Sequence, residues 1–426
     1  MSPASAARLS SRVGAASQTG RGARAPWPAW LWLPSLAVAA AALLPLLYLA
    51  LRALGAGAEV WELLFRPRTA QILGRTLALV VAVTGVSLAI SLTLAWLTTR
   101  TDVPLRRLWA VLTALPLVIP SYVAGFVVVA ALGPRGLLQQ LLAPLGVERI
   151  PEIYGFPGAL LVVTMVAFPY LLLTLQASFK GLDPALEEAS RSLGRGPWHT
   201  FFRVTLPQLR PAIAAGALLV ALYTLRDFGG VSLLRYETFT WAIYLQYQTS
   251  LDRMVAAALA LVLVAVAVGF LLLEVFTRGR SRYHRSTVGT SRPPRVISLG
   301  AWRVPALAFC VSVVLFSVAI PVSVLGYWLM RGIVAGEPVR IVWGAALNSG
   351  YASALAAAVT TIAALFIAVL SVRHASRLSG LVERATYIGF ALPGIVIALA
   401  LVFFAVNFAA PVYQTLGLLI FAYLVL

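Results

Sequence analysis

Residues 183–207 read DPALEEASRSLGRGPWHTFFRVTLP, a long charged segment that lies between strongly apolar runs and carries its own helix signals. Asp183 is suited to cap a helix whose first position is Pro184, where a missing N–H costs nothing. Glu187 and Glu188 follow in the first turns, near the positive end of the helix dipole. The pattern therefore predicts a folded helix and not a mere connection.

The second part of this segment contains two breaks. Gly194 and the pair Gly196-Pro197 predict an end to the first helix, because glycine permits a left-handed exit and proline cannot continue the backbone hydrogen bonds. We expect a second short helix over residues 198–204 that ends at Leu206-Pro207. The predicted shape is a helix, a sharp turn and a second helix.

Composition places this segment in a membrane protein. The chain has 426 residues, of which 61% are hydrophobic and 11% charged, and its mean hydropathy is +0.91. No soluble fold tolerates these values, so we expect an all-α polytopic membrane protein in contact with lipid. The net charge of +19 comes almost wholly from arginine, with Lys180 as the single lysine. Its distribution indicates membrane topology and no nucleic-acid partner.

Ten apolar runs predict the membrane-spanning helices. The first, at about residues 30–51, is longer than the core of roughly 7 to 15 residues in a secretory signal, so we expect an uncleaved helix there. Residues 1–26 before it are rich in Ser, Ala, Gly and Arg and predict a disordered cytoplasmic tail. The other runs fall at about 72–98, 108–132, 157–178, 211–233, 254–276, 304–330, 347–371, 385–408 and 412–426.

The basic residues predict the orientation of the chain. If the N-terminal tail is cytoplasmic, 22 of the 33 lysines and arginines lie in segments on that side and 11 on the other. A bias of this sign is expected of a multi-pass inner-membrane protein. We therefore expect a cytoplasmic N-terminus, with residues 183–207 facing the cytoplasm.

A linker divides the chain into two units. Residues 277–303, rich in Ser, Thr, Pro and Arg, predict a basic cytoplasmic linker between a first unit, 27–276, and a second, 304–426. The units look like repeats, which usually enclose a pathway at their interface. The matching pieces are 73–99 with 347–374, Ala114-Leu115-Pro116 with Ala391-Leu392-Pro393, and Phe168–Leu171 with Phe421–Leu424.

The second unit lacks a counterpart of residues 183–207. Glu187 lies 19 residues after Phe168, so a copy aligned on Phe421 would stand at position 440, which is 14 past Leu426. We therefore expect the second unit to be incomplete and the protein to continue with a second loop of this kind and two more helices. We also expect the 426-residue chain alone to be inactive in transport.

The sequence shows no catalytic constellation. A P-loop needs a glycine-rich turn that ends in Gly-Lys-Ser/Thr, and Lys180 has no such turn before it. Cys310 lies in an apolar run and predicts a buried, inert thiol. His199, His284 and His374 are scattered among polar connectors without metal-ligand spacing. We expect a protein that is not an enzyme and that has no metal site and no cofactor.

Arg226 and Asp227 are candidates for a translocation pathway. They close the apolar run that follows residues 183–207, and ionisable residues near membrane depth are costly and tend to face a cavity. The alternative is an interfacial pair that neutralises itself at the water boundary. Both interpretations stay open at this point.

Residues 183–207 also carry a family resemblance. Glu188-Ala189-Ser190, Gly194, Val204 and Leu206-Pro207 resemble the cytoplasmic signature loop of bacterial binding-protein-dependent ABC importer permeases, which has Glu-Ala-Ala, Gly, Ile and Leu-Pro at this spacing. Ser190 and Val204 are small departures from it. The resemblance implies the type I ABC importer transmembrane fold. It also implies that the loop couples to an ATPase through Glu187, Glu188, Ala189, Gly194, Val204, Leu206 and Pro207.

The same resemblance implies partners and a substrate. It implies two cytoplasmic ABC ATPase subunits, which hydrolyse ATP in place of this chain, and a periplasmic or lipid-anchored solute-binding protein. Val231–Phe239 and Ala242–Tyr244 resemble the corresponding segment of the fused ferric-iron permeases, which implies import of ferric iron. Thiamine, polyamines and sulfate are the alternative solutes.

Three other interpretations compete with the importer. The loop could be an ordinary amphipathic connection between helices. A secondary transporter driven by an ion gradient also has repeated halves, but it predicts several ionisable groups at mid-depth, and the apolar runs carry almost none. A membrane enzyme predicts clustered His, Asp or Glu at helix ends, and the sequence shows no such cluster.

Overall fold

The computed structural model describes residues 29–55, 62, 64–147, 149–249, 254–278, 296–337 and 343–426. The predicted tail and most of the predicted linker lie outside these residues, as does His284. Within the described part the chain is helical, and its β-structure is one isolated bridge between Thr101 and Ile297. This agrees with the predicted all-α class.

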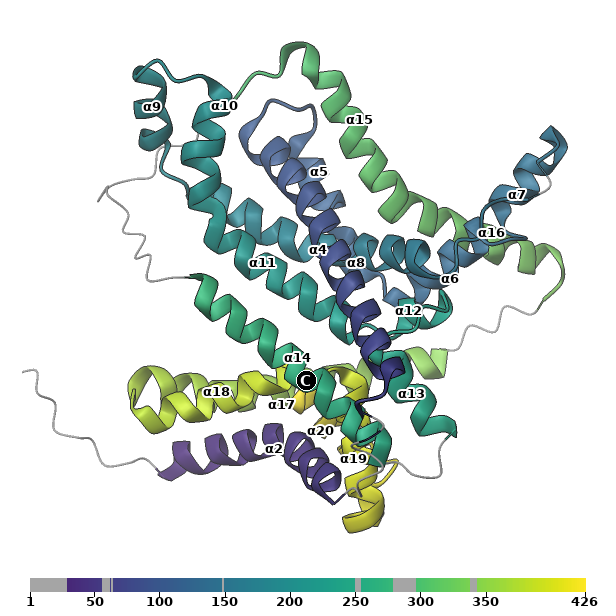
Figure 1. The fold of residues 1–426 in the computed structure, drawn as a ribbon, viewed down its shortest axis with the longest axis vertical. Coiled ribbons are helices and arrows are strands. Elements are labelled where there is room, and N and C mark those ends of the chain that lie inside the picture. Colours follow the sequence, from purple (N-terminus) through teal and green to yellow (C-terminus); the bar gives the residue numbers. More distant parts are fainter. Residues whose placement is uncertain are drawn as a thin grey trace, which may run out of the picture.

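Figure 1 shows the helices coloured in chain order. Those before the linker are α2 (Ala29–Leu54), α4 (Pro67–Arg100), α5 (Arg106–Leu112), the 3₁₀ turn η1 (Leu115–Val118), α6 (Ser121–Leu132), α7 (Leu137–Leu142), η2 (Ala143–Leu145), α8 (Phe156–Gly181), α9 (Pro184–Ser192), α10 (Pro197–Thr200), the π turn η3 (Phe201–Thr205), α11 (Leu206–Arg226), α12 (Gly229–Leu233), α13 (Phe239–Thr249) and α14 (Met254–Arg278). Those after it are η4 (Gly300–Trp302), α15 (Arg303–Val314), the π turn η5 (Leu315–Ala319), α16 (Ile320–Val334), α17 (Trp343–Arg373), α18 (Arg377–Ala391), α19 (Gly394–Phe408), η6 (Ala410–Val412) and α20 (Leu416–Val425).

Eight of the described helices or helix runs are long and apolar enough to cross a membrane. They span Ala29–Arg52, Pro67–Arg100, Ser121–Leu145, Phe156–Gly181, Pro197–Arg226, Met254–Leu273, Gly300–Val334 and Trp343–Arg373. The last two expected runs are represented by the shorter apolar helices α19 and α20. A polytopic membrane fold follows from these lengths, since about 20 apolar residues cross a bilayer core.

Prolines break two of the runs that we expected to be continuous. The run at 108–132 divides because Pro116 lies in η1 and Pro120 precedes α6, and the run at 385–408 divides at Pro393. Pro120 and Pro393 have nearly the same backbone angles, φ −59° and ψ 141° against φ −60° and ψ 137°. Pro120 and Pro393 thus each stand just before the helix that follows the break, and the pairing of Ala391-Leu392-Pro393 with Ala114-Leu115-Pro116 stays a prediction.

The two largest hydrophobic cores join most of the described helices. One core joins α4, α6, α8, α11 and α12, and its largest fully buried side chains include Leu94, Phe168 and Leu171. The other core joins α2, α11, α13, α14 and α19, with Leu49, Phe239 and Ile243 fully buried. Because α11 contributes to both cores, it links the two groups of helices that Figure 1 shows above and below it.

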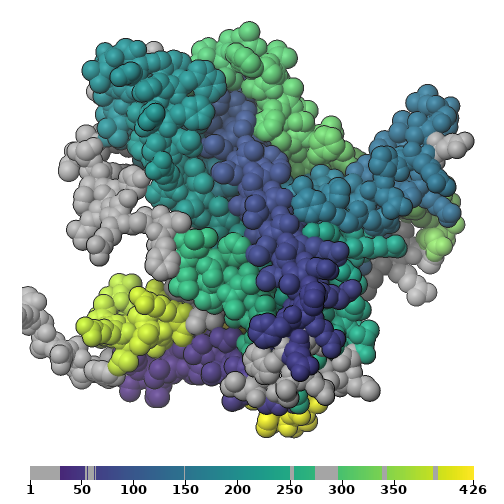
Figure 2. All heavy atoms as spheres, in the orientation of Figure 1, coloured from purple at the N-terminus to yellow at the C-terminus, as the bar shows by residue number. Residues whose placement is uncertain are grey.

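Helices before and after the predicted linker pack on one another. Helix α2 packs on α14 but also on α17, α18 and α19. Helix α15 places Cys310 in the core of α4 and α8, and α16 packs on α6. The expectation that Cys310 is a buried thiol is confirmed. This packing brings the start of α15 to the end of α4, next to residues 183–207 (Figure 2).

Candidate coupling site

The first half of the 183–207 segment folds as its sequence predicts. The Asp183 side chain accepts a hydrogen bond from Ala185 N at 3.0 Å, and Pro184 is the first residue of α9. The helix ends at Gly194, whose φ is +76°, a left-handed conformation that glycine adopts without strain. Arg195 N donates to Ser190 O at 3.2 Å across this turn. The predicted cap and sharp turn are thus confirmed.

The second half differs from the prediction. The helix that starts at Pro197 does not end at Leu206-Pro207 but runs through α10 and η3 into the spanning helix α11. Leu206 N donates to Phe201 O, five residues back, in the wide π turn. Such a turn moves the preceding carbonyls away from the ring of Pro207, which a regular α turn would bring into contact with them. The proline therefore marks a bulge and not an end.

Glu187 ties this segment to α4. Its carboxylate forms an ion pair with the guanidinium of Arg100, the last residue of α4, and accepts a hydrogen bond from Thr205 Oγ1 at 2.8 Å. The Arg100 side chain is only 3% exposed and that of Glu187 14%. One carboxylate thus joins α9, the π turn and the end of a spanning helix.

Arg100 and Thr205 were not singled out by sequence reasoning. Arg100 was used only as one of the basic residues that predict membrane orientation, and Thr205 was given no role. The sequence did contain a signal for this ion pair: Arg100 ends an apolar run of helical length, and an acidic helix is predicted on the same side of the membrane. The signal does not identify the carboxylate that pairs with the arginine.

Several other side chains of the segment are exposed and apolar. Glu188 and Ala189 are exposed, and so are four large hydrophobic side chains, Leu186, Leu193, Trp198 and Phe202. The rings of Trp198 and Phe202 are stacked, with centroids 6.1 Å apart. Trp198 and Phe202 line the same cavity as Glu187, whereas Leu186 and Leu193 of α9 lie outside it. Exposed apolar side chains beside a charge such as Glu188 are typical of a surface that binds another protein.

The predicted coupling residues therefore divide into three groups. Glu188 and Ala189 lie on the exposed side, and Gly194 forms the turn. Glu187, Val204, Leu206 and Pro207 are partly buried and connect the segment to the rest of the molecule. The structure brings Glu187 together with α4 but does not place all seven residues on one face.

Asp227 has a local structural partner. Its Oδ2 atom accepts hydrogen bonds from Gly230 N at 3.1 Å and Val231 N at 3.3 Å, so it caps α12. The residue is 7% exposed. The Arg226 guanidinium carbon lies 5.7 Å from the centre of the Tyr223 ring. Both candidates thus lie at the break between α11 and α12.

Comparison with known proteins shows the family to which the chain belongs. Residues 85–282 match the family model described as "Binding-protein-dependent transport system inner membrane component". The chain is 36% identical over 404 residues to the Fe(3+)-transport system permease protein FbpB 2 of Haemophilus influenzae, covering 94% of this chain and 76% of that protein. The chain belongs to the binding-protein-dependent ABC importer permeases.

Other members of this family are similar over about half of the permease. The molybdenum transport system permease protein ModB of Escherichia coli K12 is 32% identical over 202 residues, 46% of this chain and 87% of that protein. The sulfate transport system permease protein CysT of the same organism is 29% identical over 238 residues, 54% of this chain and 84% of that protein. The predicted ABC importer permease fold is confirmed, and the permease is a transport component.

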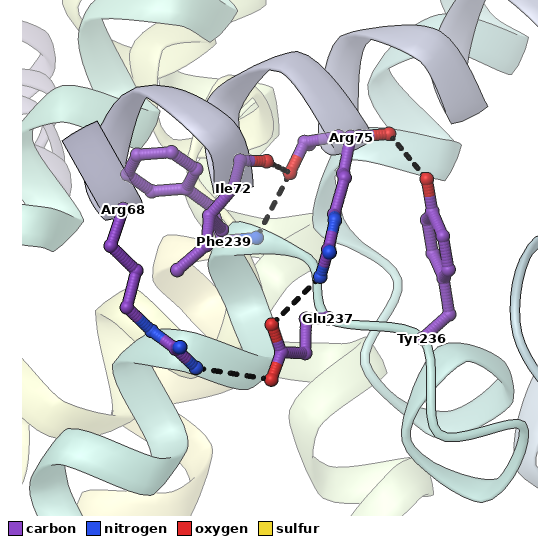
Figure 3. Close-up of polar contacts among 7 residues, drawn as sticks. Arg68, Ile72, Arg75, Tyr236, Glu237 and Phe239 are labelled. Carbon is purple, nitrogen blue, oxygen red and sulfur yellow. Dashed lines mark hydrogen bonds and ion pairs between the residues drawn. The ribbon is translucent and has the colours of Figure 1, made fainter.

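The other end of α4 in the permease is also held by a carboxylate. Glu237 pairs with Arg68 at 3.2 Å and with Arg75 at 2.9 Å (Figure 3). Tyr236 Oη donates to Arg75 O at 3.0 Å, and Phe239 N donates to Thr76 Oγ1 at 3.0 Å. Residues 236–239 are therefore bound along the first three turns of α4.

Proposed function

We propose that this permease is the membrane-spanning subunit of an ATP-driven importer and that residues 183–207 dock on a cytoplasmic ATPase subunit. The observation that carries the proposal is that this segment is fixed at one place and exposed at another. Glu187 fixes it to α4, whereas Glu188, Leu186 and Leu193 are exposed outside the cavity that Glu187 lines. A segment that is fixed at one place and exposed at another can pass a partner's movement to the spanning helices.

The proposed assembly contains two ATPase subunits and a periplasmic or lipid-anchored solute-binding protein. Within it the chain itself hydrolyses no ATP. The proposed setting is the inner membrane with the N-terminus in the cytoplasm, which the distribution of the 33 basic residues supports.

The cargo we propose is ferric iron. Support comes from the 36% identity to a relative named as an Fe(3+)-transport permease, over 94% of this chain. Molybdenum and sulfate are the competing cargoes, because permeases named for them match about half of the chain.

Uptake by the reconstituted complex tests cargo and energy source together. The permease is placed in liposomes with its ATPase and binding protein, and uptake of radiolabelled ferric iron, molybdate and sulfate is compared with ATP inside or absent. We expect ATP-dependent uptake of ferric iron only. Uptake that needs an ion gradient and no ATP would support a secondary transporter and overturn the proposal.

Docking is tested by one charge reversal. Glu188→Arg puts a cation on the exposed side of α9 without touching the Arg100 ion pair, so we expect the ATPase to be lost on co-purification while membrane insertion is unchanged. Arg195→Glu reverses a charge just past the turn and is the matched control. Normal recovery of the ATPase with Glu188→Arg would contradict docking through this face.

Orientation is tested by labelling single cysteines. In a Cys310→Ser background, Arg195→Cys should react only from the cytoplasmic side and Glu337→Cys only from the outside, since both positions are exposed. Labelling of Arg195→Cys from the outer face would overturn the topology.

Arg226 and Asp227 remain our prediction for the translocation pathway. Asp227→Asn keeps an acceptor for the Gly230 and Val231 N–H groups, so the cap of α12 should survive while a charge is removed. A drop in uptake with an unchanged unfolding midpoint would support the pathway role. Unchanged uptake would mean that Asp227 caps α12 and has no role in transport.

A further inference from the structure

A cavity of about 730 Å³ separates the coupling segment from the start of the second unit. Its walls are the second half of α4, the stretch from α9 to η3, and residues 297–309. On α4 the lining lies between Leu92 and Arg100, which are about 12 Å apart along the helix. The cavity is therefore elongated along the helix axes.

The two ends of this cavity differ in polarity. Arg100, Glu187 and Arg191 line it where α4 ends, whereas Trp96 and Phe309 line it further along α4 and α15. The start of α15 lies beside the end of α4, because Arg303 pairs with Asp102. The polar and apolar parts of both walls are thus aligned, and the shape suits an amphiphile.

The wall formed by residues 297–303 is held in place by hydrogen bonds. Ile297 N donates to Arg100 O at 2.8 Å, and Asp102 N donates to Ile297 O at 3.2 Å. The carboxylate of Asp102 pairs with Arg303 through one oxygen and accepts from Leu299 N at 2.9 Å through the other. These contacts lower the pKa of Asp102 to about 2, with the Arg303 hydrogen bond as the largest cause. The wall is therefore a fixed part of the permease at neutral pH.

The charge at the polar end favours an anion. Arg100 donates through Nη2 to Glu187, and its Nη1 atom is buried without a hydrogen-bond partner within the described residues. Arg191 is exposed and adds a second guanidinium to the lining, against the one carboxylate of Glu187. Guanidinium groups match phosphate oxygens in geometry and charge.

Two tryptophans mark the level of the cavity relative to a membrane. Trp198 and Trp302 line it, and both are more than 70% exposed. Tryptophan with an exposed ring is typical of the headgroup level, where its apolar body and its N–H both find partners. The polar end of the cavity therefore coincides with the lipid headgroups, on the proposed cytoplasmic side.

We propose that this cavity holds one anionic phospholipid, with its phosphate at Arg100 and Arg191 and an acyl chain along Leu92, Trp96 and Phe309. The inference rests on the proposed function for the orientation of the permease. A free inorganic anion would leave the apolar length of the cavity unfilled. A bound lipid touches the coupling segment, α4 and the start of α15 together, so its presence sets how closely these three elements approach.

Lipid retention by the chain alone tests the inference. The purified permease in detergent is loaded with phosphatidylglycerol or phosphatidylcholine, and bound lipid is counted by native mass spectrometry. We expect one retained phosphatidylglycerol per chain, preferred over phosphatidylcholine, and roughly fivefold weaker retention in Arg191→Gln. Arg195→Gln is the control, because Arg195 is exposed on the same loop but does not line the cavity. Equal retention by Arg191→Gln and the wild type would overturn the proposal.

A second pair of variants tests the apolar part. Ala306→Phe fills the cavity beside Phe309, whereas Ala308→Phe adds the same ring at an exposed position outside the lining. Only the first should lose the retained lipid. Displacement of the lipid by soluble glycerol phosphate would show that the site recognises only the phosphate group. This result would also overturn the proposal. None of these measurements needs the ATPase, so their failure is distinguishable from a failure of the proposed coupling.

Discussion

At its C-terminal end α4 is joined to the coupling segment by a buried ion pair, whereas at its N-terminal end two exposed arginines share Glu237 (Figure 3). The side chains of Arg68 and Arg75 are 72% and 51% exposed, against 3% for Arg100. Removing one partner of a buried pair costs about 3–5 kcal/mol, and an exposed pair contributes about 0.2–1 kcal/mol. The ion pair at the C-terminal end of α4 is therefore a rigid joint, whereas the ion pairs at its N-terminal end are weak.

This difference suits a helix that receives movement at one end. A rigid joint at Arg100 lets displacement of α9 move α4 as a body, since the buried charge of Arg100 has to stay beside Glu187. The exposed ion pairs at Glu237 add little to the hold on the far end of α4, which depends more on the buried hydrogen bond from Phe239 N to Thr76 Oγ1. Single substitutions can change one end at a time.

The largest effect is expected from Glu187→Gln. This change leaves the buried Arg100 cation without its carboxylate and should lower the free energy of unfolding by about 3–5 kcal/mol. The measurement is the unfolding midpoint of the purified permease. Glu188→Gln, the same substitution one residue along on the exposed side, should change it by less than about 0.5 kcal/mol. Equal effects of the two would mean that the joint is not rigid.

Gly194→Ala should be the next most costly. The new side chain must adopt a φ of +76°, which costs an L-residue about 1–2 kcal/mol. Gly181→Ala is the control, because Gly181 has open space around it and is not among the residues with positive φ. The same unfolding measurement applies, and an unaffected Gly194→Ala protein would show that the turn is not needed in this form.

Asp183→Ala should have a smaller effect. It removes the cap of α9, worth about 1 kcal/mol, while the ion pair of Glu187 remains. Hydrogen exchange of the α9 backbone should rise in this variant and stay low in Asp183→Asn, which still offers an acceptor. Equal exchange in both variants would show that the cap does not limit fraying.

The smallest effect is expected at the other end of α4. Arg75→Gln leaves Arg68 beside Glu237, so the cost should stay under about 1 kcal/mol and should shrink further at high salt. The unfolding midpoint at low and high salt measures this. A loss as large as that of Glu187→Gln would remove the distinction between the two ends.

Much of the coupling segment follows from local sequence rules. Asp183, Pro184 and Gly194 act on neighbours in the chain, so a cap and a left-handed turn can be predicted from the residues alone. Pro207 was misread because the same residue type either ends a helix or follows a π turn, and the choice depends on how the turn before it packs.

The partners of Glu187 could not be predicted in this way. Arg100 lies 87 residues earlier, and its contact depends on how α4 and α8 pack. The contacts of α2 with α17, α18 and α19, and of α15 with the core of α4 and α8, likewise depend on packing, since the sequence of an apolar run does not determine which other run it contacts. The sequence thus predicts the segment but not the joint that connects it to α4.

The central claim is that Glu187 passes the movement of the ATPase to α4. Its most direct test is the number of solute molecules transported per ATP hydrolysed, measured on purified complexes that already contain the ATPase, for the wild type and Glu187→Gln. We expect Glu187→Gln to keep the ATPase bound and to lose roughly tenfold in this ratio, the range of a coupling free energy between two sites. An unchanged ratio in the assembled Glu187→Gln complex would contradict the account.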